Sequence, residues 1–509
     1  MAGQPVEKLN TKLMRQSMKF EFDAVVIGGG AAGLTASGIA ANFGAKTMMI
    51  EKNKLGGDCT WTGCIPSKTL IKAASVVHQT QKSQKYGVNV SVDDIDLTKL
   101  LKHVDEVRRE VYEDADRPEI FEEMGIEVVH GDAVFKDSHT IEIKFADGNT
   151  RLVTSRYIFI CSGSSAFVPD IPGLSNVDYL TNDTLFEIDD IPDSITIIGA
   201  GPIGCEMAQS FARLGKNVTV LDMAERIMVN DDPELSDILK SRLEQEGVTF
   251  LLGSSIQKIG QNDHGIEVKY KIGDKEKAVI SQSLLMATGR RANVSKLNLE
   301  SAGVQFTDKG INVDDKCRTS QRHIYAAGDV TGRYQFTHMS EHMAKVAVTN
   351  ALIKVPMKID QMHVPWATYT DPELAQVGAK EAELKEKGVK FETYRFPFSK
   401  IDRAITDGNT NGMIKIHAKK WSGKILGASV CGAHAGEMIS QYALAMKNGV
   451  SLRDFADTIH PYPSYGLGAR RAADQWYIKN QSETLVKWIK RIFRYRGEIP
   501  DYSDPDRIV

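Results

Sequence analysis

Two cysteines with four residues between them, Cys59 and Cys64, are the residues of this chain best suited to redox chemistry. A helical run follows them, so Cys64 falls near a helix start, where unpaired N–H groups and the helix dipole stabilise a thiolate. Lys68 lies one turn further on and faces the same surface. A disulfide fits this spacing if Cys59 lies in a non-helical lead-in. The spacing predicts a redox pair; two inert core cysteines or half of a zinc site are the alternatives.

The chain before this pair has the pattern of a dinucleotide-binding unit. A buried strand is expected over 22–27, a helix over 34–43, and a second strand over 46–50 that closes on Glu51. The loop between the first strand and the helix carries Gly28, Gly30 and Gly33. Such glycines allow close backbone approach, the helix N-terminus receives a pyrophosphate, and the acidic residue binds the ribose hydroxyls. The first unit therefore predicts a bound dinucleotide.

The same pattern recurs 171 residues further on, with strands expected over 194–198 and 217–221. Gly28, Gly30, Gly33, Gly44 and Glu51 correspond in this way to Gly199, Gly201, Gly204, Gly215 and Asp222. Two such units predict two dinucleotides with electrons passing between them; one working unit and one decayed copy is the alternative. Only the first unit runs directly into the cysteines, so its dinucleotide is expected beside the thiols. A flavin fits best there, because it takes a hydride and passes an electron pair to a disulfide.

Three further motifs carry a family resemblance. They are Cys161-Ser162-Gly163-Ser164, the segment 286–291 with Gly289, and Ala326-Ala327-Gly328-Asp329. Together with the segment 365–373, they make the chain resemble the flavin-dependent pyridine nucleotide–disulfide oxidoreductases. That family includes dihydrolipoamide dehydrogenase, glutathione reductase and mercuric reductase. The resemblance runs from about residue 20 to about residue 476.

The resemblance implies an α/β fold with two Rossmann-like domains, for FAD and for NAD, plus an α+β C-terminal dimerisation domain. It places the FAD domain at 1–165 and 290–360 and the NAD(P) domain at 166–289, followed by an interface domain at 361–476. Strands are expected over 412–416 and 425–430, with a helix over 436–446. In the family the active site lies between two subunits, so a homodimer is implied.

The resemblance also assigns roles to residues. Cys64 is the thiol against the flavin, and Cys59 is the thiol that exchanges with substrate. Lys68 and Glu206 match an ion pair beside the reactive edge of the flavin, although Glu206 taken alone reads equally well as a solvated helix residue. Asp329 matches the residue that binds the ribityl chain. The other cysteines are expected to be packing residues: Cys161, Cys205, Cys317 and Cys431.

The family pattern breaks near the C-terminus. Members that process dithiols carry a His-Pro and then a Glu, a general-base dyad that reaches the cysteines of the second subunit. In one register Tyr462 takes the His position and Leu467 the Glu position; in the other, His460 is kept and Tyr465 replaces the Glu. Neither register restores a dyad. A Tyr in the base position resembles mercuric reductase, but no cysteine follows Cys431.

These observations predict an NAD(P)H-dependent FAD disulfide oxidoreductase. Electrons would pass through Cys59 and Cys64 to a small acceptor, a metal ion or a disulfide, as in mercuric reductase. A dihydrolipoamide dehydrogenase with an altered base and a redox-sensing flavoprotein are the alternatives. NADH is expected to be preferred over NADPH, because Asp222 repels a 2′-phosphate and Gly204 fits the NAD form; Arg226 is the one nearby cation.

Composition limits the remaining classes. The chain of 509 residues is 42% hydrophobic with a net charge of −3, which gives no electrostatic footprint for nucleic acid. Its six cysteines do not make a disulfide scaffold and, without a secretory signal, favour a reducing, cytoplasmic setting. No apolar run is long enough to span a bilayer.

The tail at 477–509 is basic and amphipathic. After Gln481, one helical face is expected to carry Leu485, Val486, Ile489, Ile492 and Phe493, and the opposite face Lys487, Lys490, Arg491 and Arg494. This pattern is typical of a helix that lies on an anionic membrane, here at the cytoplasmic face. The alternative is that the apolar stripe packs on the protein's own surface or on a dimer partner.

Overall fold

The computed structural model describes residues 20–92 and 94–499. These residues form two compact units, each assembled from three stretches of the chain. Unit 1 falls within Met1–Gly57, Ala115–Ser164 and Ala292–Ile359, and unit 2 within Asp58–Asp114, Ser165–Arg291 and Asp360–Val509. The cysteine pair and the second glycine loop both belong to unit 2. The division into three domains and a tail stays a prediction, and its residues 1–19 and 500–509 lie outside the described part of the chain.

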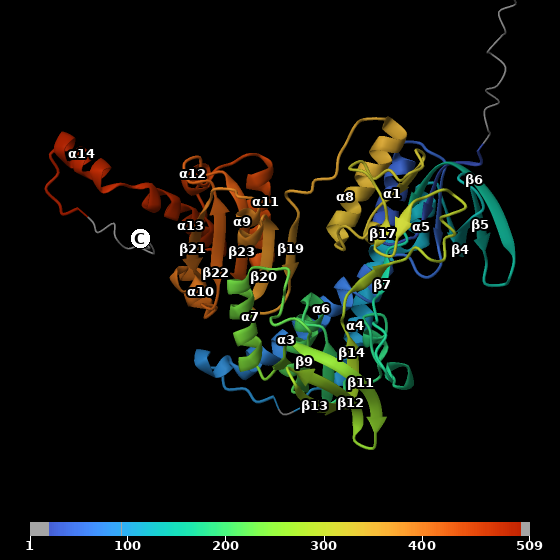
Figure 1. The fold of residues 1–509 in the computed structure, drawn as a ribbon, viewed down its shortest axis with the longest axis horizontal. Helices are drawn as coiled ribbons and strands as arrows, with labels where there is room; N and C mark the ends of the chain where they lie inside the picture. Colours follow the sequence, from blue (N-terminus) through green and yellow to red (C-terminus); the bar gives the residue numbers. More distant parts are fainter. Residues whose placement is uncertain (1–19, 93, 500–509) are drawn as a thin grey trace, which may run out of the picture. The chain divides into compact units, whose positions relative to one another are not determined.

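Unit 1 is built on a sheet of seven strands (Figure 1). Six lie in the order β3-β2-β1-β6-β5-β4, and β18 pairs with β6. The pairs among β3, β2, β1, β6 and β18 are parallel, whereas β4, β5 and β6 form an antiparallel meander. The strands are β1 (Phe22–Ile27), β2 (Thr47–Glu51), β3 (Ile126–His130), β4 (Asp132–Phe135), β5 (Thr140–Lys144), β6 (Thr150–Ile160) and β18 (Ile324–Ala326).

Helices cover the parallel part of this sheet. α1 (Ala31–Asn42) packs against α8 (Thr337–Val348), and α5 (Pro118–Glu123) packs on β3. Strand β1 matches the prediction residue for residue, because a parallel strand covered on both faces is an almost continuous apolar run. The helix expected from residue 34 begins earlier, since Gly30 is its N-cap and the third loop glycine lies inside the first turn.

The middle of unit 2 repeats this plan. Its parallel sheet has the order β10-β9-β8-β14, and an antiparallel sheet β11-β12-β13 is inserted between β10 and β14 in the sequence. Strands β8 and β9 have the predicted bounds. The elements are β8 (Ser194–Ile198), α6 (Pro202–Arg213), β9 (Asn217–Leu221), α7 (Pro233–Gln245), β10 (Thr249–Leu251), β11 (Ser254–Asn262), β12 (Gly265–Ile272), β13 (Lys275–Ser281) and β14 (Ser283–Met286).

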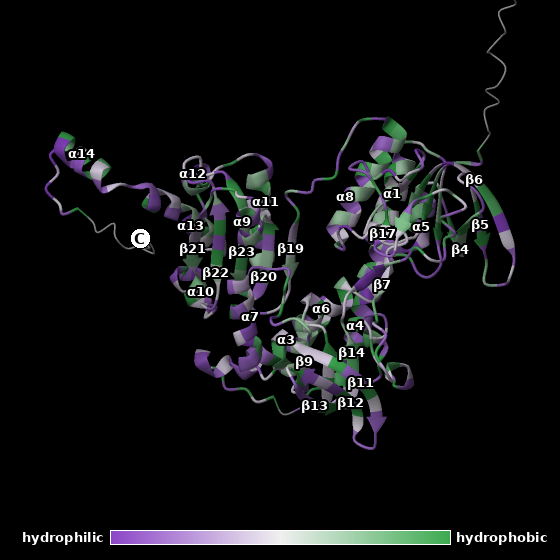
Figure 2. Ribbon diagram, in the orientation of Figure 1, coloured by the Kyte–Doolittle hydropathy of each residue, from purple (hydrophilic) through white to green (hydrophobic). Residues whose placement is uncertain are grey.

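The C-terminal part of unit 2 is an antiparallel sheet of five strands in the order β19-β20-β23-β22-β21. Its strands are rich in hydrophobic residues (Figure 2), and α11 and α13 pack on them. The elements are β19 (Pro365–Thr368), β20 (Glu373–Gly378), α9 (Glu381–Glu386), β21 (Glu392–Pro397), α10 (Asp402–Asp407), β22 (Met413–Ala418), β23 (Ile425–Gly432), α11 (Ala435–Lys447), α12 (Leu452–Asp457), α13 (Tyr465–Asn480) and α14 (Glu483–Phe493). The strands and the helix predicted here are confirmed, as is the helical tail. None of the described helices combines the length and the apolar character needed to cross a membrane.

The remaining elements of unit 2 belong to the cysteine segment. They are α2 (Gly57–Trp61), α3 (Cys64–Gln81) and α4 (Leu97–Val111). Four short strands complete the fold: β7 (Ser164–Ala166), β15 (Arg290–Ala292), β16 (Phe306–Thr307) and β17 (Gly310–Ile311). α3 packs on α4 and on α6, so the cysteine segment shares a core with the second dinucleotide unit. The fold as a whole is α/β with two Rossmann-like units and an α+β C-terminal part, as predicted.

A buried ion cluster joins α7 to the C-terminal sheet. The Lys415 ammonium lies 2.8 Å from a carboxylate oxygen of Asp232, 3.1 Å from one of Glu234 and 3.2 Å from one of Glu381. Burial alone would lower the pKa of Lys415, but its hydrogen bond with Asp232 raises that pKa above the usual value. Because Asp232 is also fully buried and caps α7, it depends on this cation for its charge balance.

We expect Lys415→Met to lower the free energy of unfolding by about 3–5 kcal/mol, because it leaves the buried Asp232 carboxylate without a counter-charge. Lys420→Met is the matched control, since Lys420 makes a solvent-exposed pair with Glu392 on the same sheet and should change stability by less than about 1 kcal/mol. Denaturant titration followed by circular dichroism measures both. Equal midpoints for the two variants would contradict the assignment of Lys415 as the structural cation.

Candidate active site

The two glycine loops have the same construction. Gly28 and Gly199 adopt φ of +104° and +114°, a region that favours glycine. A Cβ on either would collide with the carbonyl oxygen of the residue just after the neighbouring strand, β6 or β14. A Cβ on Gly33 or Gly204 would collide with the carbonyl oxygen of the first glycine of its own loop. The first and third glycines therefore hold the helix against the sheet.

The middle glycines, Gly30 and Gly201, have open space instead. A Cβ on Gly30 would lie 3.8 Å from its nearest neighbour, and one on Gly201 would meet nothing within 4 Å. These two residues are the N-caps of α1 and α6, and neither helix has a side-chain cap. The N–H groups of the first turn, which in α6 begin at Ile203 because Pro202 has none, can thus face an anion where the middle glycine leaves room. This arrangement fits a dinucleotide pyrophosphate at each loop.

The acidic residue of each unit is held in the same way. Glu51 accepts hydrogen bonds from the N–H of Gly29 at 2.6 Å and of Asn53 at 2.7 Å. Asp222 accepts them from the corresponding N–H groups, of Ala200 at 2.6 Å and Ala224 at 2.8 Å. A carboxylate has further acceptor capacity beyond these two bonds, so both acids can still bind ribose hydroxyls. The offset seen in the sequence is therefore also a repeat of geometry.

Unit 1 also contains Asp329 and Gly163, which the family resemblance places at the FAD, whereas Lys68 belongs to unit 2. Asp329 follows β18 and accepts a hydrogen bond from the Ser164 hydroxyl at 2.6 Å. Gly163 adopts φ of +67°, and its carbonyl accepts from the N–H of Asn293 at 3.0 Å. Gly289 has the corresponding position after the second dinucleotide-binding sheet, in unit 2. It adopts φ of +119°, and its carbonyl accepts from the N–H of Phe167. Their cofactor roles stay predictions that this geometry fits.

The cysteine pair lies on two helices. Cys64 is the first residue of α3, whose first turn has no acidic side chain and whose N-cap, Gly63, makes no side-chain cap bond. Cys64 therefore lies at the positive end of the helix dipole, at a helix start as predicted. Cys59 lies in the short helix α2 rather than in a non-helical lead-in, because the chain is broken at Thr62 and Gly63 instead of before the pair. Both cysteines are half-buried.

Two arginines that sequence reasoning did not single out hold α2 in place. Arg108 from α4 is buried and donates to the terminal carbonyl of α2, at Trp61, over 2.9 Å, and to Glu187 over 2.6 Å. Arg290 forms an ion pair with Asp58, the residue before Cys59. The only sequence signal was that Arg290 lies in the crossing motif at 286–291. These contacts position the backbone that carries Cys59.

Glu206 is buried, not solvated, and it accepts from two directions. One carboxylate oxygen lies 2.9 Å from the Lys68 ammonium, and the other accepts from the N–H of Tyr369 at 2.8 Å. The Lys68 ammonium also lies 4.8 Å from the centre of the Tyr369 ring. The ion pair implied by the resemblance is thus present, whereas the solvated alternative for Glu206 is wrong, because α3 and the segment after β19 cover this face of α6.

The other four cysteines are buried. Burial raises the pKa of Cys161 to about 12 and raises the pKa of Cys205, Cys317 and Cys431 as well. Thiols that stay protonated are poor nucleophiles and poor metal ligands. Their burial and raised pKa values agree with the prediction that the four cysteines are packing residues.

The C-terminal residues lie around the start of α13. Tyr462 is exposed, and His460 bonds the Thr458 carbonyl through Nδ1 and stacks on Phe455. Leu467, at the Glu position of one register, is 7% exposed. Tyr465, at the Glu position of the other, gives its hydroxyl to Asp407 at 3.0 Å. Neither position offers a carboxylate to orient an imidazole.

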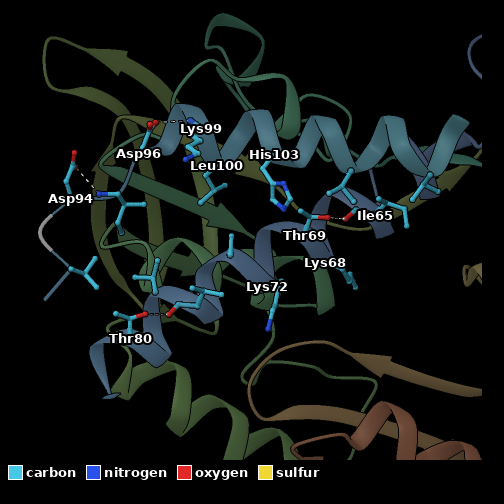
Figure 3. A pocket seen from close by; sticks show the side chains of 17 residues that line it. Ile65, Lys68, Thr69, Lys72, Thr80, Asp94, Asp96, Lys99, Leu100 and His103 are labelled. Carbon is cyan, nitrogen blue, oxygen red and sulfur yellow. Dashed lines mark hydrogen bonds between the residues drawn. The ribbon is translucent and has the colours of Figure 1, made fainter. Parts of the chain in front are cut away.

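A pocket of about 840 Å³ extends along α3 and α4 (Figure 3). One end reaches Ile65 and Lys68, next to Cys64, and the other end reaches Thr80. Apolar side chains from both helices dominate its lining, with Lys72, Lys99 and His103 among the polar groups. No thiol or thioether lines it, so this pocket adds no soft ligand to the cysteines.

One group among the described residues has the composition of a metal site. Ligand atoms of Asp232, Glu381 and His417 lie within 4.8 Å of one another. The Lys415 ammonium already pairs with both carboxylates, and burial lowers the pKa of His417 to about 4. The chain therefore supplies its own cation at this position.

Two glycine loops and a half-buried cysteine pair at a helix start are the features expected of an oxidoreductase that uses two dinucleotides and a thiol pair. Comparison with known proteins makes this specific. The Pyridine nucleotide-disulphide oxidoreductase profile matches residues 22–344, and the dimerisation domain of the same family matches residues 364–472. The chain belongs to this family and is a flavoprotein oxidoreductase; its dimerisation domain supports a homodimer.

Individual relatives are similar over most of the chain. Mercuric reductase of Bacillus cereus is 33% identical over 471 residues, which cover 92% of this chain and 73% of that protein. Dihydrolipoyl dehydrogenase of Geobacillus stearothermophilus is 31% identical over 89% of this chain and 96% of its own. A solved Cu(II) complex of the HOCl-induced flavoprotein disulfide reductase RclA of Escherichia coli has a TM-score of 0.79 at 27% identity, covering 89% of this chain and 99% of that one. The identities to a mercuric reductase and to a dihydrolipoyl dehydrogenase, 33% and 31%, are too similar to each other to determine the acceptor of this chain.

The middle and third glycines of the second loop should respond differently to the same substitution. Gly201→Ala fits the free protein but fills the space expected for the pyrophosphate, so we expect an unchanged melting temperature and a Kd for NADH raised at least roughly tenfold. Gly204→Ala forces α6 away from β8 and should lower the melting temperature. Thermal unfolding and NADH titration of the flavin-loaded protein measure both. Unchanged NADH binding in Gly201→Ala would contradict the assignment of this loop.

Proposed function

We propose that the protein reduces a thiophilic metal ion, with Hg²⁺ as the representative acceptor, using electrons from NADH. The observation that carries this proposal is the buried Leu467 at the position where a dithiol-processing member has a carboxylate. Without that carboxylate there is no group to orient a general base, which dihydrolipoamide chemistry requires. The similarity to mercuric reductases supports the same acceptor class.

Two-electron reduction of a metal ion does not need a base at the exchanging sulfur. One NADH and one Hg²⁺ give NAD⁺, Hg⁰ and one proton, so no proton has to reach the acceptor. Cys59 and Cys64 offer the soft thiolate ligands that such an ion prefers. The Tyr462 hydroxyl would serve as a hydrogen-bond donor or an oxygen ligand rather than as a general base. By family resemblance it would serve the cysteines of the second subunit.

The cofactor-binding residues fit this route. The Gly28 loop, Glu51 and Asp329 would hold FAD, and the Gly199 loop and Asp222 would hold NADH. A bound flavin supplies acceptance of a hydride and release of the electron pair to a disulfide. Lys68, held by Glu206, would place a positive charge beside the reactive edge of the flavin, while the α3 dipole would stabilise the Cys64 thiolate.

We expect dihydrolipoamide turnover to be poor. Its kcat/KM should be about 10²–10⁴-fold lower than that of an enzyme with the His–Glu dyad, because this chain lacks the general base. Tyr462→His combined with Leu467→Glu should raise it, because the pair recreates the dyad. Steady-state assays with dihydrolipoamide and NAD⁺, and with NADH and Hg²⁺ in excess thiol, measure the two activities. Retained flavin checks folding, since Leu467→Glu places a carboxylate in a buried position. High wild-type dihydrolipoamide turnover with no gain in the double variant would identify a dihydrolipoamide dehydrogenase instead.

Single substitutions identify the working residues. Cys59→Ser and Cys64→Ser should abolish Hg²⁺-dependent NADH oxidation while FAD stays bound, and Tyr462→Phe should lower it. Substitution of His460 by Ala tests the other register, because only that register places His460 at the acceptor. An effect of His460→Ala larger than that of Tyr462→Phe would reverse the assignment of the two residues.

NADH should be preferred over NADPH. As the acid at the end of its strand, Asp222 would repel a 2′-phosphate. The Arg226 guanidinium donates to the Val229 carbonyl at 3.0 Å. We expect Asp222→Asn to shift the ratio of kcat/KM for NADPH over NADH upward by roughly 10–100-fold, the effect of one hydrogen bond to a charged group. Glu225→Gln removes the same charge from an exposed neighbour and is the control. A wild-type enzyme with the higher kcat/KM for NADPH would contradict this prediction.

A further inference from the structure

Apolar and charged side chains lie on separate faces of helix α14. None of the residues predicted to act in catalysis belongs to this helix. At about 100° per residue, its apolar side chains occupy one continuous arc of the helix. That arc consists of Leu485, Val486, Trp488, Ile489, Ile492 and Phe493. Lys490 borders the arc on one side and Arg491 lies on the other, so cations flank the apolar face. Figure 2 shows hydrophobic and hydrophilic residues alternating along this helix.

The apolar arc is not covered within the described chain. No residue of α14 is buried, and Trp488, Ile492 and Phe493 are 61–62% exposed. The helix nevertheless has an ordinary start, because the Ser482 hydroxyl accepts from the N–H of Leu485 at 3.1 Å. Among residues 20–92 and 94–499, the stripe therefore does not pack on the protein's own surface. An exposed apolar surface of this kind marks a site of interaction with a partner or a membrane.

Charge identifies the occupant. Residues 483–499 carry five basic and two acidic side chains, in a chain whose net charge is −3. Two copies of α14 packed face to face would bring their flanking cations together, which disfavours a second copy as the partner. An anionic lipid surface satisfies both parts of the helix, because the apolar arc enters the acyl boundary while Lys and Arg reach the headgroups.

We propose that α14 is an interfacial helix that docks the enzyme on an anionic membrane surface. Trp488 and Phe493 are the aromatic anchors. Lys487, Lys490 and Arg491 supply the electrostatic attraction. The helix lies in the plane of the surface and does not cross it. Docking does not depend on the acceptor that the enzyme reduces, so it can be tested independently of the metal-ion proposal.

Liposome flotation of the full-length, flavin-loaded protein tests this proposal. We expect binding to vesicles of equal parts phosphatidylglycerol and phosphatidylcholine, weak binding to phosphatidylcholine alone, and release at high salt. Trp488→Ala should weaken binding roughly tenfold or more through lost apolar burial. Changing Lys487, Lys490 and Arg491 together to Gln should weaken it on the order of 100-fold, at about fivefold for each charge.

Trp421→Ala is the matched control, because Trp421 is also an exposed tryptophan but lies in the turn between β22 and β23. It should leave vesicle binding unchanged, and all variants should keep wild-type NADH oxidation with an artificial electron acceptor. Absence of binding to anionic vesicles, or an equal loss in Trp421→Ala, would overturn the proposal. A change of molecular mass in Trp488→Ala, measured by light scattering without lipid, would assign the face to a second copy instead.

Discussion

The buried carboxylate of Glu206 links the cysteine helix α3 to α6, the helix that follows the second glycine loop. It joins Lys68 of α3 and the backbone of Tyr369 to α6, and these two contacts use both of its carboxylate oxygens. The N-cap of α6 is Gly201, in the loop predicted to bind the second dinucleotide. One rigid helix therefore presents the nucleotide site at its start and holds the cysteine helix one turn later. Loss of either partner would leave a buried charge and loosen both sites together.

The two dinucleotide units show how little a sequence must keep to preserve a site. The N–H of the second loop residue bonds the acid in both units at 2.6 Å, although one acid is Glu51 and the other is Asp222. The surroundings differ in composition, since α6 starts with Pro202 and α1 with Ala31. What both units retain is the carbonyl contact that excludes a Cβ from the first and third glycines. Backbone approach, not side-chain identity, is the conserved constraint.

The predictable and unpredictable parts of the site differ in the range of their interactions. Strands β1 and β8 could be predicted exactly, because burial on both faces produces a short continuous apolar run. The loop glycines and their acids could be found because they act within one βαβ unit. The burial of Glu206 could not, since its partner Lys68 lies 138 residues away. The same holds for Arg108, whose Trp61 contact spans 47 residues, and no local pattern distinguishes it from a surface arginine.

The burial of four of the six cysteines affects how well the protein resists reagents that modify thiols. Thiophilic ions and oxidants attack thiolates, and a chain with many reactive cysteines would be inactivated wherever it met them. Cys161, Cys205, Cys317 and Cys431 lie in the interior, and their raised pKa values keep the sulfur protonated. Cys59 and Cys64, on α2 and α3, are half-buried instead. The packing of the core thus protects these four sulfurs from chemical modification.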